Sequence, residues 1–255
     1  KIQNLDTLKS VLQSYYKISS VQGLELALQD PRIGASFFPG TMNQIVARAL
    51  DFERLFPAPI PRLGQKQAGV ITFTRQQVAS ILANMFLCTF PTDELGQISL
   101  DPRISFKQLL STNARHEVAK LQMFIHYFER ISSVPDGPEG NIQVRRICVE
   151  QESSPWAHST TPLRAFEIVD GSIDDADGCL QADFANKYIG GGVLTGGCVQ
   201  EEIRFAVSPE LCASMLVCPA MTDPEAIIIT GAERFSSAQG YMFSLRFGGS
   251  YNDPT

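Results

Sequence analysis

The chain has 255 residues, of which 44% are hydrophobic, so it is long enough to bury a sizeable core in one large or two small domains. Its 21 Lys and Arg residues against 27 Asp and Glu residues give a formal net charge of −6, which argues against broad electrostatic binding to nucleic acid. An anionic ligand would therefore need local donors, such as backbone amides at the start of a helix.

The first half of the chain has the spacing of helices. Apolar residues on one face predict a helix over residues 5–16 and a longer one over 114–131. Capping-box patterns that begin at Thr41 and Thr74 predict two further helix starts.

Near residue 135 the pattern changes to short β-like runs separated by turns and helical segments. These runs predict strands over 143–149, 165–169, 180–184, 226–230 and 241–247. Ser208-Pro209-Glu210 predicts a helix start between two of them. Because strands alternate with helices, we expect an α/β region over 136–255 that follows a helical region over 1–135.

Six cysteines lie in otherwise apolar segments, without a Cys-x-x-Cys pair or a Cys/His cluster. This pattern argues against a disulfide framework or a zinc site and favours buried, reduced thiols in a nuclear or cytosolic protein. No apolar run approaches the length of a transmembrane helix.

The chemistry concentrates in residues 180–206. Asp183 and Asn186 come first, and five glycines follow within eight residues, at Gly190, Gly191, Gly192, Gly196 and Gly197. Such glycines let the backbone approach a ligand closely, and their N–H groups beside a helix start can bind phosphate. The pattern is neither a P-loop nor Gly-x-Gly-x-x-Gly, so it predicts a pyrophosphate-type site of another kind.

Gln200, Glu201 and Glu202 follow the glycines at the predicted start of an amphipathic helix. Adjacent helix residues point about 100° apart, so the two acids are a poor candidate for a facing glycosidase pair. On a helical wheel Glu202 lies roughly 45° from the apolar direction and Glu201 roughly 145°. We therefore expect Glu202 on the less solvated side, where the pKa of a carboxyl tends to rise and suit general-acid work.

Each part of the pattern also has a purely structural interpretation. A glycine-rich turn can simply link a strand to a helix, acids in a first helical turn favour the helix dipole, and Asp183 and Asn186 are common turn formers. The occurrence of all three parts in one run argues against that interpretation. His116, His126 and His158 lie outside this run, and we expect them on helix surfaces or in loops.

The run resembles the signature of the poly(ADP-ribose) glycohydrolases, in which a glycine triplet and a short spacer precede Gln-Glu-Glu. The resemblance covers most of the chain from about residue 56 and includes Leu180-Gln181, Asp183-Phe184-Ala185-Asn186, Pro209-Glu210-Leu211, Ile228-Ile229-Thr230-Gly231 and Gly240-Tyr241. It implies an α/β, macrodomain-like mixed sheet flanked by helices and preceded by an accessory helical region. The family continues well beyond the position of Thr255, so we expect the C-terminal part of the macrodomain to be missing from this chain.

The resemblance also implies roles for individual residues in hydrolysis of the ribose–ribose O-glycosidic bonds of poly(ADP-ribose). Glu202 would be the general acid/base, Glu201 and Asn186 would orient ribose hydroxyls, and Asp183 would support them. The substrate-binding set would further contain Gln200, the diphosphate-binding amides of Gly190, Gly191, Gly192, Gly196 and Gly197, Asp174 near the adenine, and Tyr241.

The implied partners are poly(ADP-ribose) on modified proteins and ADP-ribose as product, without direct DNA binding, membrane contact, metal or organic cofactor. We expect a monomer that acts in the DNA damage response, in the nucleus or cytoplasm. Two alternatives remain open: a non-catalytic macrodomain that only binds ADP-ribose, which needs no acid pair, and a purely structural helical scaffold.

Overall fold

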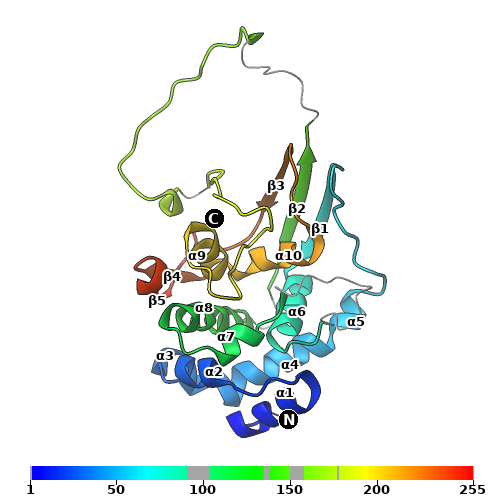
Figure 1. Cartoon of the computed structure of the whole chain (residues 1–255), viewed down its shortest axis with the longest axis vertical. Helices are drawn as coiled ribbons and strands as arrows, with labels where there is room; N and C mark the ends of the chain where they lie inside the picture. The colour runs from blue at the N-terminus through cyan, green and yellow to red at the C-terminus, as the bar shows by residue number, and fades with distance from the viewer. Residues whose placement is uncertain (1, 91–103, 135–137, 150–157, 177, 255) are drawn as a thin grey trace.

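The computed structural model describes residues 2–90, 104–134, 138–149, 158–176 and 178–254 (Figure 1). The first part is built mainly of helices. They are α1 (Leu5–Tyr16), α2 (Gln22–Ala27), α3 (Pro31–Ser36), the π-helical η1 (Phe37–Thr41), α4 (Met42–Leu50), α5 (Phe52–Leu55), α6 (Arg75–Phe86), α7 (Lys107–Ser111) and α8 (Arg115–Ser132).

Two of the predicted helix starts have different outcomes. The Thr74 side chain accepts the N–H of Gln77, and the Gln77 side chain accepts the N–H of Thr74, so the capping box that opens α6 is confirmed. The capping box at Thr41 is wrong: Thr41 has helical dihedrals, makes no side-chain cap bond and is buried. The reason is that η1 runs directly into α4, so the backbone there is already helical and needs no cap.

The second part contains two small sheets and short helices. Its elements are β2 (Asn141–Cys148), η4 (Ile173–Asp175), α9 (Gln200–Val207), η5 (Pro209–Cys212), α10 (Ala213–Val217), β3 (Glu225–Thr230), β4 (Ser236–Gln239), η6 (Met242–Ser244) and β5 (Arg246–Ser250). The predicted helix start after Ser208 is confirmed by η5 and α10, although the Ser208 side chain makes no cap bond.

One sheet crosses the predicted boundary between the two parts. A strand that the sequence analysis missed, β1 (Gly69–Thr74), pairs antiparallel with β2, and β2 pairs antiparallel with β3. The second sheet is the antiparallel pair β4–β5. The expected α/β architecture is confirmed, with antiparallel pairing in every ladder of the described residues, while the boundary at 135/136 falls outside those residues.

The strands predicted over 165–169 and 180–184 are wrong. Both segments are irregular and largely exposed, and residues 158–172 leave the body of the molecule as a long loop (Figure 1). A β-like composition forms a strand only where a neighbouring strand completes the hydrogen-bonded ladder, and these segments pair with none of the described strands. The run over 241–247 is wrong in its first half, where η6 stands, and confirmed where β5 begins.

Helix α8 is the central element of the core. It packs against α2, α7 and η1 on one side and against α9, η6 and β5 on the other. Figure 1 shows α1 to α4 gathered at the bottom and the three-stranded sheet at the upper right, with α9 and α10 between them. Phe106 packs edge-on against Phe124 of α8 with ring centroids 4.7 Å apart. Any polar residue on α8 that faces α9 is therefore placed inside the protein.

The sequence predicts the histidines on helix surfaces or in loops and the cysteines as buried thiols; burial contradicts the first expectation for one histidine and supports the second for most cysteines. His116 is buried, with its ring edge-on to Phe243 at 5.1 Å, so its predicted surface position is wrong. His126 is half-buried and His158 is exposed. All six cysteines are unpaired, and four are buried: Cys88, Cys198, Cys212 and Cys218. Among the described residues, no helix has both the length and the apolar character needed to cross a membrane.

Candidate active site

The residues that the signature singles out meet at the start of α9. This helix begins directly after a series of tight turns over residues 189–196, and its apolar residues Ile203, Phe205, Ala206 and Val207 are buried. The turns fold back over the first helical turn instead of extending away from it. Three successive side chains, Gln200, Glu201 and Glu202, each accept main-chain N–H groups from the preceding segment.

Glu201 joins two points of that segment. Its Oε2 accepts the N–H of Asn186 at 2.9 Å, and its Oε1 accepts the N–H of Gly190 at 2.7 Å. Only 3% of the residue is exposed. Burial raises the pKa of the Glu201 carboxyl to about 7, an effect opposed by the two N–H groups and reinforced by the charges of Asp183 and Glu202.

Glu202 joins residues 189–198, the glycine turns, to the helix start. Its Oε1 accepts the N–H of Gly192 at 2.9 Å, and its Oε2 accepts the N–H of Val199 at 2.9 Å. The second bond is the carboxylate half of a capping box; the valine has no side-chain oxygen with which to complete it. Glu202 is 7% exposed.

The expected contrast in burial between the two glutamates is therefore wrong. Both carboxyls are buried, including that of Glu201, which the helical wheel placed toward solvent and whose pKa burial raises to about 7. The wheel treats the side of a helix away from the core as solvated, whereas here residues 186–192 cover that side. Asp183 also belongs to the group, because partial desolvation and then the charge of Glu202 raise its pKa to about 6, although the residue as a whole is exposed.

Gln200 holds the start of the same segment. Its Oε1 accepts the N–H of Phe184 at 3.0 Å, and its Nε2 donates to the carbonyl of Ala182 at 3.2 Å. The two bonds reproduce the pattern of one rung of a β-ladder, which the irregular residues 180–184 otherwise lack. The glutamine thus positions the chain that carries Asp183 and Asn186. The side chain of Asn186 accepts the N–H of Tyr188 at 3.2 Å.

The glycines allow the backbone to approach the two carboxyls. Gly191 has φ +48°, and a methyl group there would overlap Oε1 of Glu202 and lie 2.8 Å from Oε2 of Glu201. A methyl group at Gly197 would lie 2.7 Å from Oε1 of Glu202. Gly190 and Gly192 donate to the glutamates, while Gly191 and Gly197 donate to the carbonyls of Tyr188 and Gly192. These donors are engaged within the chain, so their assignment to a diphosphate stays a prediction.

A buried lysine that the sequence analysis did not consider binds the glycine turns from α8. Lys120 on α8 has no exposed surface, and its Nζ donates to the carbonyls of Gly192 at 3.3 Å, Thr195 at 2.6 Å and Gly197. A sequence signal for it exists, since residue 120 precedes the inward-facing Phe124 by four positions and so lies on the apolar face of the helix.

The other two predicted ligand residues lie at the edges of this group. Asp174 Oδ1 is 4.0 Å from Nη1 of Arg204, a residue of α9. Tyr241 is half exposed, and it precedes η6, whose Met242 carbonyl contacts Sγ of Cys198 at 3.1 Å. Both residues therefore belong to segments that contact the glycine turns or α9, while neither contacts the glutamates directly in the interactions the structure records.

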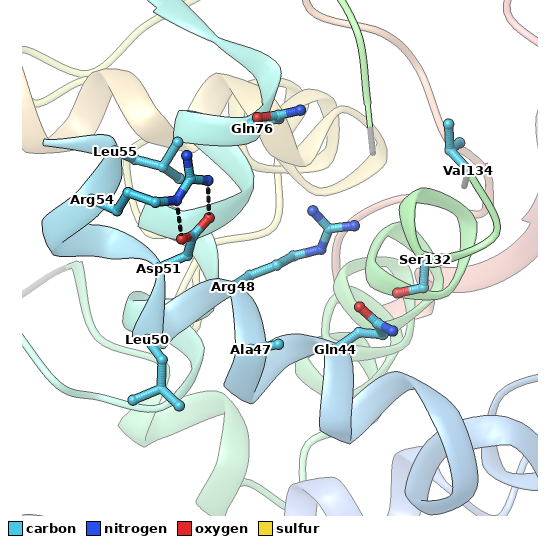
Figure 2. A pocket seen from close by; sticks show the side chains of 10 residues that line it. All are labelled: Gln44, Ala47, Arg48, Leu50, Asp51, Arg54, Leu55, Gln76, Ser132 and Val134. Atoms are coloured by element: carbon cyan, nitrogen blue, oxygen red, sulfur yellow. Dashed lines mark hydrogen bonds and ion pairs between the residues drawn. The ribbon is translucent and has the colours of Figure 1, made fainter. Parts of the chain in front are cut away.

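A cavity of about 640 Å³ lies elsewhere, between α4, α5 and the ends of α6 and α8. In Figure 2, Arg48 extends along this cavity, and Arg54 turns toward Asp51, with which it forms an ion pair of 2.5 Å. Its lining contains none of the signature residues. Among the described residues, no three His, Cys, Asp or Glu side chains are grouped so that they could hold a metal ion.

Two protein-family models match the chain. A model described as "Poly (ADP-ribose) glycohydrolase (PARG), helical domain" matches residues 30–146, and one described as "Poly (ADP-ribose) glycohydrolase (PARG), Macro domain fold" matches residues 153–255. Together the two matches cover well over half of the chain.

Individual relatives agree with these family models. "Poly(ADP-ribose) glycohydrolase 1" of Arabidopsis thaliana is 42% identical over 198 residues, covering 75% of this chain and 36% of that protein. "Poly(ADP-ribose) glycohydrolase 1" of Caenorhabditis elegans is 32% identical over 242 residues, covering 92% of this chain and 28% of that protein. The chain thus spans about a third of the length of these relatives, and by both kinds of match it belongs to the poly(ADP-ribose) glycohydrolase family.

Proposed function

We propose that this chain is catalytic and hydrolyses the ribose–ribose O-glycosidic bonds of poly(ADP-ribose), releasing ADP-ribose. One observation carries the proposal: two adjacent carboxyls, both buried, are held at the start of α9 by amides of a glycine-rich segment. A protein that only binds ADP-ribose has no need of two buried acids, whose desolvation costs free energy. Membership of the family supports the same reaction.

Glu202 is the proposed general acid and base. In the first step it donates a proton to the departing ribose oxygen, and the glycosidic C–O bond breaks to leave an oxocarbenium-like centre. In the second step its carboxylate takes a proton from water, whose oxygen forms the new bond to that centre. Each Glu202 oxygen already accepts one N–H, and a carboxylate oxygen has a second lone pair with which to act on substrate.

Glu201 has the proposed role of binding and orienting ribose hydroxyls together with Asn186. Its two oxygens have the same free acceptor capacity as those of Glu202, and its amide partners hold it in place. Burial raises the pKa of Glu201 to about 7 and that of Asp183 to about 6, which favours their protonated forms more than in free carboxyls.

The remaining ligand contacts are finer parts of the proposal. The amides of residues 190–197 would approach the diphosphate, Asp174 would read the adenine, and Tyr241, which is half exposed, offers an aromatic face to the ligand. We further propose a monomer that acts on polymer attached to proteins, in the nucleus or cytoplasm and in the response to DNA damage. The net charge of −6 supports recognition of the polymer through local donors instead of a basic field.

The test uses Glu202→Gln in the full-length protein. We expect ADP-ribose release from polymer to fall roughly 10²- to 10⁴-fold, because the amide cannot donate or accept the proton, while calorimetry shows ADP-ribose binding within a few-fold of wild type. Glu210→Gln is the matched control: Glu210 is also buried with a pKa of about 7, but it contacts Glu233 and Arg75 instead of the signature, so its turnover should persist.

Four outcomes distinguish the interpretations. Loss of hydrolysis in Glu202→Gln alone supports the proposed enzyme. Wild-type protein that binds ADP-ribose without releasing it from polymer supports the non-catalytic alternative. Absence of any ADP-ribose affinity in the wild type supports a structural scaffold, and normal turnover by Glu202→Gln contradicts the role given to that residue.

A further inference from the structure

Lys120 is a charged residue in a place where charge is costly. It lies on α8 with no exposed surface, and lysine is almost never fully buried unless its ammonium has partners. Its position is not explained by packing alone, since a methionine would fill similar space without desolvating a charge. The partners of the ammonium therefore indicate what the residue does.

The ammonium meets three carbonyls of one short segment. The three acceptors are Gly192 at 3.3 Å, Thr195 at 2.6 Å and Gly197, all more than seventy positions away in the chain. A lysine ammonium has three N–H donors, so every donor has an acceptor within the glycine turns. These turns also bond within themselves, because Thr195 and Gly197 donate their N–H groups to the carbonyl of Gly192.

Gly192 connects the lysine to the proposed acid. Its carbonyl accepts from Lys120, and its N–H donates to Oε1 of Glu202 at 2.9 Å. Gly197, another acceptor of the lysine, lies so close that a methyl group there would come within 2.7 Å of the same oxygen. A displacement of the turns relative to α8 would therefore displace Glu202 or remove its amide donor.

We propose that Lys120 is a positioning residue for Glu202: it anchors the glycine turns to α8, so that Gly192 holds the carboxyl of Glu202 in its reactive place. The expected effect of Lys120 on catalysis rests on the proposed function. The anchoring of the glycine turns does not, because it is a property of the ligand-free protein. It also gives α8, an element of the helical region, a direct part in arranging the site.

The charges around Lys120 are consistent with this role. Burial lowers the pKa of the Lys120 ammonium to about 8, and the effect is opposed by Cys198 of the glycine turns, Glu117 of its own helix, Glu202 of α9 and Cys212 of η5. Above about pH 8 the neutral amine has only two N–H donors for three carbonyls, and its lone pair faces the third. The anchor should therefore weaken at alkaline pH.

The test compares Lys120→Met with Ile125→Val in the full-length protein. Ile125 is also buried on α8, and because it lies about 140° around the helix from Lys120, its shortening perturbs the core on a different face. We expect Lys120→Met to lower kcat roughly 100-fold, as a displaced catalytic group does, with a KM change of only a few-fold. Ile125→Val should keep kcat near wild type even where its Tm falls.

Amide hydrogen exchange in the ligand-free protein provides a readout that does not depend on activity. Exchange over residues 190–199 should speed up in Lys120→Met and stay unchanged in Ile125→Val. Unchanged exchange in the turns of Lys120→Met, or equal kcat in the two variants, overturns the proposal. Wild-type protein without hydrolase activity would contradict the proposed function alone, since the exchange comparison would still decide whether Lys120 anchors the turns.

The wild type supplies a second test in case Lys120→Met does not fold. The protection factors of its amides over residues 190–199, which correct for the intrinsic rise of exchange with pH, should decline with an apparent pKa near 8, in the range where the fold persists by circular dichroism. Protection factors that stay constant from pH 7 to about pH 10 overturn the proposal, because three carbonyls would then be held as well by an amine as by an ammonium.

Discussion

Gly190 donates its backbone N–H to Oε1 of Glu201 at 2.7 Å, and this bond closes the glycine turns over the first turn of α9. The opposite oxygen of the same carboxyl holds the N–H of Asn186. The carboxyl therefore holds both ends of a five-residue segment and covers itself from solvent by doing so. Removal of either acceptor should open the segment while leaving the rest of the fold in place.

Glu201→Gln should produce that local opening. The amide side chain has one oxygen and one NH₂ group, so one of the two N–H donors loses its acceptor and faces another donor. We expect faster hydrogen exchange at Asn186 and Gly190 and at least a ten-fold loss of polymer hydrolysis. The free energy of unfolding should decrease by about 1 kcal/mol. Glu53→Gln, on the exposed surface of α5, is the control and should change none of these three quantities.

Gly191→Ala should disturb both carboxyls at once. The residue has φ +48°, and the added methyl group would overlap Oε1 of Glu202, so backbone strain and steric conflict act together. We expect a loss of kcat on the order of 100-fold and a destabilisation of about 1–2 kcal/mol, measured by polymer hydrolysis and urea unfolding.

Gly40→Ala is the matched control for that substitution. No atom lies within 4 Å of its added methyl group, and Gly40 belongs to the helical η1 (Phe37–Thr41). It should leave activity unchanged and stabilise the fold slightly, by about 0.5 kcal/mol, through the unfolded state. Equal activity of the two alanine variants would mean that Gly191 has no special role.

Stability should decrease as the pH rises from about 4.5 to 7, in part because of Glu210. Burial raises the pKa of this carboxyl to about 7, an effect opposed by the charge of Arg75. The folded state therefore holds a proton that the unfolded state has already released, and the resulting stabilisation is complete below the unfolded pKa and lost as pH approaches 7. Urea unfolding at pH 5, 6 and 7 should show a smaller decrease in Glu210→Gln than in wild type, with a difference on the order of 1–3 kcal/mol.

The comparison of wild type with this single variant separates Glu210 from other carboxyls with raised pKa values, such as Glu201 and Asp183, which contribute equally to both proteins. If the difference between the two proteins does not vary with pH, Glu210 does not titrate in this range.

Arg146 holds the three-stranded sheet to the segment before β3. Its guanidinium forms a fully buried ion pair of 3.0 Å with Glu225 and donates to the carbonyls of Leu63, Pro219 and Ala220. Arg146→Met leaves a buried carboxylate without its counter-charge, so we expect a loss of about 3–5 kcal/mol in urea unfolding. Arg145→Met is the control, because Arg145 is exposed on the opposite face of β2, and it should change stability by less than about 0.5 kcal/mol.

The helices and the location of the candidate site could be predicted from the sequence. The spacing that predicted residues 5–16 and 114–131 corresponds to α1 and α8, and the capping box at Thr74 opens α6. These features depend on residues within one or two turns of each other, so a short stretch of sequence contains the whole cause. The glycines before Gln200 are equally local, because the turns and the helix start are contiguous.

Only the tertiary structure decided which of these residues are buried and what they contact. Strand β1 forms because β2 lies beside it and completes its hydrogen bonds. Residues 165–169 form no strand because none of the described strands lies beside them. Glu201 is buried because the turns fold over the helix, and Lys120 reaches the turns because α8 packs against α9. Desolvation and hydrogen-bond partners come from segments distant in the chain, so the raised pKa of Glu201 and the anchoring by Lys120 follow from packing and not from local sequence.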